Sequence, residues 1–117
     1  REMIIDLPIG QDRHSKKIKC VFLKTGKDAL THFKEIKTKG NYTLVKCQIE
    51  TGRKHQIRVH LNHLHHPIIG DTLYGKTSSM IKRMALHAYC LEFIHPLTYQ
   101  TIKIECLLPF DMEKIIR

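Results

Sequence analysis

The residues best suited to chemistry stand together in one stretch, TGRKHQIRVHLNHLHHPIIGDTLYG, which covers positions 51–75. Basic side chains and imidazoles surround a short series of apolar residues there. Three chemistries use such a set: a metal ion held by imidazoles, a phosphate held by cations, and a buried carboxylate held by a guanidinium. The spacing of these residues and the rest of the chain have to decide among the three.

Metal binding is the chemistry that the imidazoles suggest first. Two of them, His60 and His63, stand three residues apart, so a helix would place both on one face. The chain has neither an H-E-x-x-H motif nor a pair of cysteines at zinc-finger spacing. We therefore expect no metal site. The histidines of the stretch are His55, His60, His63, His65 and His66.

Apolar spacing predicts a helix in the first part of the stretch. Ile57, Leu61 and Leu64 follow the helical period, which indicates a buried stripe on an amphipathic helix of about three turns. Thr51 is the expected N-cap, and Pro67 bounds the helix at its other end.

This helix would give its basic residues different surroundings. Arg58 falls on the flank of the buried stripe, partly covered at the rim of a cleft. Arg53 and Lys54 fall in the first turn, where unpaired backbone N–H groups favour an anion. One interpretation is a phosphate or carboxylate held at the helix start, and the other is a basic face that meets only water. His60 lies near the stripe and could be a hydrogen-bonded core residue.

Three other polar residues are expected to serve the backbone. Asp71, within IIGDTLYG, is interpreted as a turn residue that bonds its own backbone. His87 and His95 stand in or beside a predicted strand, where a histidine most often bonds a backbone carbonyl. Tyr74 and Tyr89 are too scattered to form a stacking platform for bases.

The remaining segments predict short strands around the helix. Gly40 and Asn41 fit a two-residue hairpin turn between two alternating stretches. In the first stretch the alternation places Thr31 and Phe33 on one side and His32 on the other. A short helical turn is expected at 78–84. The fold class is α+β, with a mainly antiparallel sheet and a short helix packed on it. Strands are expected at 3–10, 18–24, 29–39, 42–50, 85–93 and 100–108.

Composition indicates the kind of partner and the cellular compartment. The 117 residues suit a single domain, and they carry a formal net charge of +9, which indicates an anionic partner, with nucleic acid ahead of membrane. No segment approaches the roughly 20 apolar residues that cross a bilayer. The four cysteines include no C-x-x-C pair, so we expect reduced thiols in a cytoplasmic protein.

Taken in order, these residues resemble a known family. The stretch at 51–75, followed by RMALHAYCLEFIHP and by LPFD, resembles the C-terminal half of the RluA-type pseudouridine synthases. Upstream, IDLPIGQD and GKDALTHFKEI resemble the segments that precede that signature. The resemblance covers nearly the whole chain at natural spacings. It implies the C-terminal half of the pseudouridine synthase fold.

The resemblance also implies a reaction and a partner. Enzymes of this type convert uridine in ribosomal or transfer RNA to pseudouridine without a cofactor, after flipping the target base out of the RNA. Their essential aspartate lies in an Arg-Leu-Asp motif, and a tyrosine in a later motif packs on the base. Neither motif occurs in this chain. Residues 1–117 are thus expected to be a C-terminal catalytic subdomain without its nucleophile, inactive alone.

Site residues follow from the same resemblance. Arg58 matches the active-site arginine that holds the catalytic carboxylate, and without that partner it is expected to be strained or filled in by water. Leu86, in the matching Leu-His-Ala, is expected to contribute to the apolar floor beneath the base. The candidate contacts to RNA or to the cleft wall are Arg53, Lys54, His55, Gln56 and His60.

Three residues depart from the family pattern, and an alternative remains open. Lys54 stands where a small hydroxyl residue is common, and His65 and Tyr99 stand where glycine is common, which leaves two loop shapes uncertain. The alternative function is a non-catalytic RNA-binding module. Half of a sheet would expose edges and apolar surface, so self-association of residues 1–117 is expected.

Overall fold

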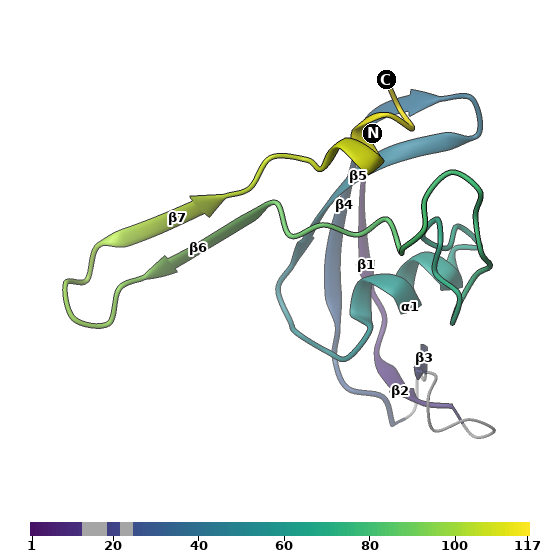
Figure 1. Ribbon diagram of the computed structural model, residues 1–117. Helices are drawn as coiled ribbons and strands as arrows, with labels where there is room; N and C mark the ends of the chain where they lie inside the picture. Colours follow the sequence, from purple (N-terminus) through teal and green to yellow (C-terminus); the bar gives the residue numbers. More distant parts are fainter. Residues whose placement is uncertain (13–18, 22–24) are drawn as a thin grey trace.

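The computed structural model describes residues 1–12, 19–21 and 25–117 as an α+β arrangement, which confirms the predicted fold class (Figure 1). All strand pairs in the described part are antiparallel, and they form a three-stranded sheet in the order β1-β4-β5 and two two-stranded sheets, β2-β3 and β6-β7. The elements are β1 (Glu2–Asp6), β2 (Ile9–Gln11), β3 (Lys19–Val21), β4 (Leu30–Lys39), β5 (Tyr42–Ile49), α1 (Gln56–His63), β6 (Cys90–Ile94), β7 (Thr101–Glu105) and α2 (Phe110–Glu113).

The β4–β5 hairpin confirms the turn and the alternation that the sequence predicts. Lys39 pairs with Tyr42 across the two-residue connection, and Gly40 takes the left-handed φ of 59° that a turn this tight can require. Thr31 and Phe33 are buried on the side that faces α1. A register shift between Glu35 and Lys37 interrupts the regular pairing, as a β-bulge does.

Helix α1 differs from the prediction in length and in its buried face. It spans eight residues and begins at Gln56, because His55 takes a left-handed φ of 58° that a helix cannot continue through. The predicted N-cap, Thr51, lies outside the helix and makes no cap there. The buried residues are Gln56, Val59 and His60, whereas the predicted stripe of Ile57, Leu61 and Leu64 is only partly covered. That prediction was wrong because polar bonds to the sheet orient the helix.

The end of α1 has the hydrogen bonds of a Schellman motif. The His65 N–H donates to the Asn62 carbonyl at 2.9 Å, and the His66 N–H donates to the Leu61 carbonyl at 2.9 Å. His65 occupies the left-handed position with φ 64°, where glycine is the usual residue. Tyr99, in the turn between β6 and β7, has φ 59°. Both loops therefore keep the backbone shape that glycine favours, although a side chain is present.

A small apolar core lies between α1 and the strands. Ile9, Ala29 and Val59 are its buried members, and Val21 and Tyr74 pack against it. This core joins β2 and β3 to the inner side of α1 and includes the ring of one residue from the 68–75 loop. It therefore fixes where that loop meets the helix.

The C-terminal hairpin projects from the rest of the molecule (Figure 1). Strand β6 begins at Cys90, so residues 85–89 do not form the predicted strand, and residues 78–84 do not form the predicted helical turn. The segment 84–86 instead bonds back to the 68–75 loop, where the Ala85 N–H donates to the Ile69 carbonyl at 2.8 Å. The predicted strand at 18–24 is confirmed at Lys19–Val21, and its other residues lie outside the described ones.

The histidines near the hairpin differ in what they bond. The ring of His87 bonds the Cys106 carbonyl at 2.9 Å, as predicted. The His95 ring instead accepts the N–H groups of Leu97 and Thr98, at 3.1 and 3.2 Å, so its prediction was wrong. The two bonds to the His95 ring tighten the turn between β6 and β7.

The described residues form no membrane-spanning helix, no cluster of metal ligands and no disulfide. No helix among them has the length and apolar character needed to cross a membrane. No three metal-ligating side chains of residues 1–12, 19–21 and 25–117 gather closely enough to hold an ion. The four cysteines, Cys20, Cys47, Cys90 and Cys106, are free thiols.

We predict that His65→Gly leaves the protein as stable or raises its free energy of unfolding by up to about 1 kcal/mol, because the left-handed conformation is strained for a side chain. The same change two residues earlier, His63→Gly, should cost about 0.5–1 kcal/mol, because position 63 is helical. Urea denaturation of both variants measures the two differences. A loss of stability in His65→Gly as large as that in His63→Gly would contradict the strain at position 65.

Candidate functional site

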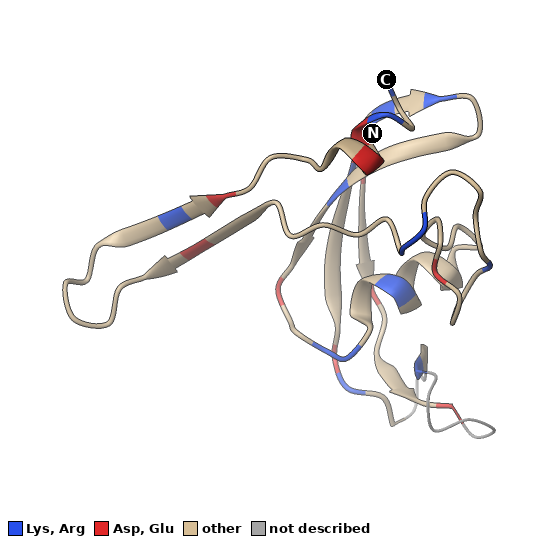
Figure 2. Ribbon diagram, in the orientation of Figure 1, with Lys and Arg blue, Asp and Glu red and all other residues tan. Residues whose placement is uncertain are grey.

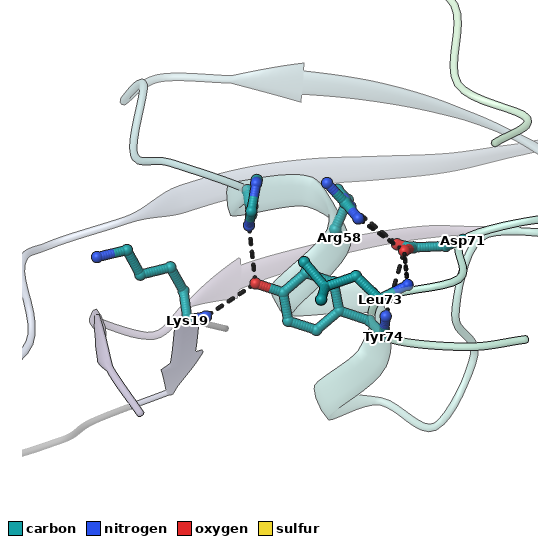
Figure 3. Close-up of polar contacts among 6 residues, drawn as sticks. Lys19, Arg58, Asp71, Leu73 and Tyr74 are labelled. Atoms are coloured by element: carbon teal, nitrogen blue, oxygen red, sulfur yellow. Dashed lines mark hydrogen bonds and ion pairs between the residues drawn. The ribbon is translucent and has the colours of Figure 1, made fainter. Parts of the chain in front are cut away.

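The centre of the site is an ion pair between α1 and the loop that follows it. Arg58 donates from Nε to Asp71 Oδ2 at 2.9 Å and from Nη2 to Asp71 Oδ1 at 2.8 Å (Figure 3). Asp71 Oδ1 also accepts the backbone N–H groups of Leu73 and Tyr74, at 3.1 and 3.2 Å. The Asp71 side chain is fully buried, and that of Arg58 is 18% exposed.

Hydrogen bonds keep both members of this pair charged. Burial alone would raise the pKa of the Asp71 carboxyl, but the bonds from Arg58 and from the Tyr74 and Leu73 N–H groups outweigh it and lower this pKa. The bond to Asp71 raises the pKa of Arg58 above its usual value. A bidentate guanidinium–carboxylate contact is among the strongest of hydrogen-bonded pairs, so the arrangement is rigid.

This pair corrects two expectations from the sequence. Asp71 does bond the backbone of its own turn, as predicted, but it is also the buried partner of Arg58. The guanidinium of Arg58 was expected to be strained or surrounded by water without an acid from elsewhere, and that expectation was wrong. The chain itself supplies the carboxylate that compensates this cation.

Tyr74 supports the pair from the side. Its ring centroid lies 5.1 Å from Arg58 Cζ, which is a cation–π contact. Its hydroxyl accepts the Lys19 N–H at 2.8 Å and lies 2.9 Å from His55 Nδ1 (Figure 3). The ring of Tyr74 is therefore held from β3 and from the residue that precedes α1.

His55 and Tyr74 are both kept neutral. Burial, with the nearby Arg58 and Lys54 charges, lowers the pKa of His55, and burial raises the pKa of Tyr74. The tyrosine hydroxyl accepts from Lys19 and shares a second hydrogen bond with His55 Nδ1. The outer nitrogen of the His55 ring thus remains for a further hydrogen bond, from a neutral ring beside the basic residues.

Gln56 joins the start of α1 to β4. Its amide nitrogen donates to the Leu30 carbonyl and to the Thr31 hydroxyl, both at 2.9 Å. Its amide oxygen accepts from the Thr51 hydroxyl at 2.7 Å and from the Arg53 N–H at 3.1 Å. Because Gln56 is 3% exposed and all these bonds lie inside the protein, the prediction that it contacts RNA does not fit this structure.

His60 continues the same network and is completely buried. Its Nε2 donates to the Leu7 carbonyl at 2.9 Å, and its Nδ1 lies 2.8 Å from the Thr31 hydroxyl. A carbonyl can only accept, so Nε2 carries the hydrogen and Nδ1 accepts from Thr31. Burial lowers the pKa of His60, which keeps the ring neutral. Its predicted contact with RNA is therefore also replaced by a structural role.

The other sequence-predicted residues lie at the surface. Arg53 and Lys54 are exposed in the connection before α1, and Figure 2 shows Lys and Arg gathered there and within the helix. Arg53 donates from Nε to the Asp28 carbonyl at 2.7 Å, which fixes its stem. Leu86 is 37% exposed in the segment before β6. The bond from Ala85 to Ile69 links this segment to the loop that carries Asp71.

Sequence reasoning missed the importance of Asp71 and Tyr74. Both lie in G-D-T-L-Y-G, and the turn signal explained the aspartate without any partner. Their closeness to Arg58 depends on how the loop folds back against α1, which spacing alone does not determine. The only usable signal is an acidic residue in a loop that is otherwise uncharged and carries Ile68, Ile69 and Leu73, since an aspartate would be costly to bury there without a cation.

Comparisons with known proteins all find RNA pseudouridine synthases. A family model described as RNA pseudouridylate synthase matches residues 1–63. The chain is 46% identical over 116 residues to an uncharacterized RNA pseudouridine synthase of Bacillus subtilis, covering 99% of this chain and 41% of that relative. It is 38% identical over 126 residues to ribosomal large subunit pseudouridine synthase D of Xanthomonas campestris, covering 95% of this chain and 38% of that relative.

Solved structures agree with these relatives. Human RNA pseudouridylate synthase domain containing 1 superposes with a TM-score of 0.79 at 28% identity, over 93% of this chain and 49% of that chain. The chain spans about two fifths of the length of the curated relatives it matches.

We predict that the buried His60 makes stability depend on pH. Because its pKa is lower in the folded protein than the ordinary 6.5, the unfolded chain takes up the proton first as the pH falls. The free energy of unfolding should therefore decrease below about pH 6.5, by at most about 1.4 kcal/mol per pH unit for this one group. Thermal unfolding between pH 7.5 and 5.5 measures the slope.

His60→Gln should remove this part of the slope, since an amide can donate to the Leu7 carbonyl without titrating. His63→Gln, at an exposed position of the same helix, is the matched control and should keep the slope. Equal slopes in His60→Gln and the wild type would show that another group causes the loss of stability at acid pH.

Proposed function

The chain belongs to the RNA pseudouridylate synthase family, and we propose that the protein containing it isomerises uridine to pseudouridine in folded RNA. In this reaction the N1–C1′ bond breaks, a C5–C1′ bond forms, a proton leaves C5 and one is gained at N1. No redox partner or group donor is needed, so the atoms and electrons balance within the substrate. Family membership is the main support for this proposal, and the net charge of +9 supports a polyanionic substrate.

Arg58 has the central role in this proposal. It holds the carboxylate of a catalytic aspartate that comes from outside residues 1–117, and these residues form the C-terminal part of the catalytic domain. Its position supports the role, since it lies at the edge of α1 with 18% of its side chain exposed. A planar guanidinium keeps a carboxylate ionised and oriented for nucleophilic attack.

The exposed basic residues beside Arg58 are the proposed contacts to RNA. Arg53 and Lys54 would meet phosphates, and the neutral His55 ring would form a hydrogen bond to RNA through its outer nitrogen without adding charge. Leu86 is proposed for the apolar floor under the flipped base, in keeping with its partial exposure.

The substrate class is proposed as ribosomal or transfer RNA, in the cytoplasm. The name of the Xanthomonas campestris relative, a ribosomal large subunit pseudouridine synthase, favours ribosomal RNA for that protein and is our reason to test it first. The second candidate function is a non-catalytic RNA-binding module. The exposed Arg53 and Lys54 would serve that function equally well, because phosphate contacts need no catalytic carboxylate.

Tritium release from RNA labelled at uridine C5 tests the activity. The full-length protein that contains this chain should release tritium, and residues 1–117 alone should release none. Release by residues 1–117 would place the nucleophile within this chain, against the proposal. Binding of RNA by the full-length protein without release from ribosomal or transfer RNA would favour the binding module.

In the active protein, Arg58→Lys should lower turnover by on the order of 10²–10³, because the flexible ammonium cannot reproduce the planar fork. RNA affinity should change little, since the proposed partner is a carboxylate and not a phosphate. Arg117→Lys, in an exposed pair with Glu113, is the control and should leave both unchanged. Equal losses in affinity and turnover would instead make Arg58 a phosphate contact.

Self-association of isolated residues 1–117 is proposed through the β6–β7 hairpin. Leu91 pairs with Ile104 and Phe93 with Ile102, so these four side chains share one face, and no other strand of the described residues pairs with either edge of this two-stranded sheet. Leu91 and Ile104 are 60% and 54% exposed. A two-stranded sheet with an uncovered apolar face is only marginally stable in water, which favours association.

Light scattering should therefore find oligomers of residues 1–117 at micromolar concentration. Phe93→Lys should shift them toward the monomer, because it charges the apolar face. Thr101→Lys adds the same charge on the opposite face and is the control. A strictly monomeric wild-type chain would contradict this proposal.

A further inference from the structure

Arg58 is restrained on one edge and on one face, which leaves its other edge open. Asp71 takes Nε and Nη2, a side-on contact that uses two of the five guanidinium N–H groups. Tyr74 lies against one face of the group, with its centroid 5.1 Å from Cζ. Three N–H groups remain, one on Nη2 and two on Nη1, and one from each nitrogen points off the end of the group. Within the described part of the chain, Nη1 donates no hydrogen bond.

Asp71 can impose this orientation because its own position is fixed. Besides Arg58, it accepts two backbone N–H groups from its own loop (Figure 3). Next to it, Gly70 has φ 78°, and a Cβ there would lie 2.3 Å from the Arg83 carbonyl oxygen. The loop is thus packed against the 83–85 segment so closely that only glycine fits. A carboxylate in such a loop cannot follow a moving arginine, so the arginine must conform to it.

The open end matches what a second anion needs. Two parallel N–H groups on Nη1 and Nη2 can bind both oxygens of a carboxylate or two oxygens of a phosphate. Arg58 is partly exposed, so a group from another segment can reach it. A guanidinium without Asp71 would be free to rotate about its long stem, and that freedom would be lost only when the second anion bound.

We propose that Asp71 is a positioning residue, which holds the Arg58 guanidinium so that its Nη1–Nη2 end faces the catalytic carboxylate. This inference rests on the proposed function for the identity of the second anion. It adds a residue that acts only through Arg58 and touches neither the uridine nor the nucleophile. The proposed active-site acid and Asp71 would then share one arginine, each on its own edge.

The test is a double-mutant cycle in the full-length protein, with tritium release and RNA binding as readouts. Asp71→Asn places an amide N–H against the Arg58 Nε–H, so the Nε bond and the negative charge are lost, while Oδ1 can still accept from Nη2 and from the backbone. We expect kcat to fall about 10–100-fold, the range seen when a supporting residue is lost. The KM for RNA should stay within about twofold.

The variant Asp71→Asn/Arg58→Lys should be no slower than Arg58→Lys alone, since Asp71 acts through the guanidinium. Additive losses, or a rise in KM without a fall in kcat, would overturn the positioning role. Glu113→Gln is the matched control. It removes the carboxylate of a similar side-on pair, with Arg117, and should leave kcat unchanged.

A second measurement covers a variant that fails to fold or a protein that proves inactive. In the wild-type protein the Arg58 Nε–H should give its own ¹⁵N NMR signal with slow exchange against water, assigned by its loss in Arg58→Lys. Fast exchange or an averaged signal would overturn the orientation by Asp71. If the signal behaves as expected and no RNA releases tritium, the proposed function fails while the orientation of Arg58 by Asp71 stands.

Discussion

Asp71 is held in a tight loop with its carboxylate out of contact with water, and the Arg58 guanidinium is the cation that compensates it. Removing one member of a buried pair leaves an uncompensated charge and costs about 3–5 kcal/mol. The loop and the helix must therefore meet at this point. Tyr74 and Gly70 bring the loop there, and the polar bonds of α1 to β4 bring the helix there. The pair in turn fixes which edge of Arg58 remains available.

The basic and histidine-rich stretch has some side chains that point into the protein and others that face the solvent. Gln56 and His60 lie one turn apart on α1 and point into the protein, where they and Thr31 form a continuous set of hydrogen bonds. Arg58 lies between them on the flank and turns toward the loop. What the sequence presents as one cluster of cationic and imidazole groups is thus divided into an inner part that supports the fold and an outer part that faces the solvent.

The strands were the part of the fold that sequence could predict. Alternation and the Gly40–Asn41 turn identified β4 and β5, because two alternating stretches on either side of a tight turn predict a β-hairpin. The helix was found, but its start and its buried side were wrong, since Gln56 and His60 bond groups that stand far away in sequence. Long-range polar bonds leave no periodic trace. Asp71 was assigned to its turn and not to Arg58 for the same reason.

The departures from the family pattern at His65 and Tyr99 became informative only in the three-dimensional structure. Both residues take the left-handed conformation that glycine would adopt with less strain. The loop shapes are therefore set by the bonds around them, such as the Schellman pair at the end of α1, and not by the residue at the turn. Such positions can change type while the surrounding fold keeps its form.

A crystal structure of the full-length protein would test the central claim most directly, because it would show what lies at the open end of Arg58. We predict an aspartate carboxylate from outside residues 1–117 within about 2.7–2.9 Å of Nη1 or Nη2, with Asp71 still bound at Nε. An Arg58 that has left Asp71, or one whose open end faces solvent with no carboxylate in reach, would contradict the account.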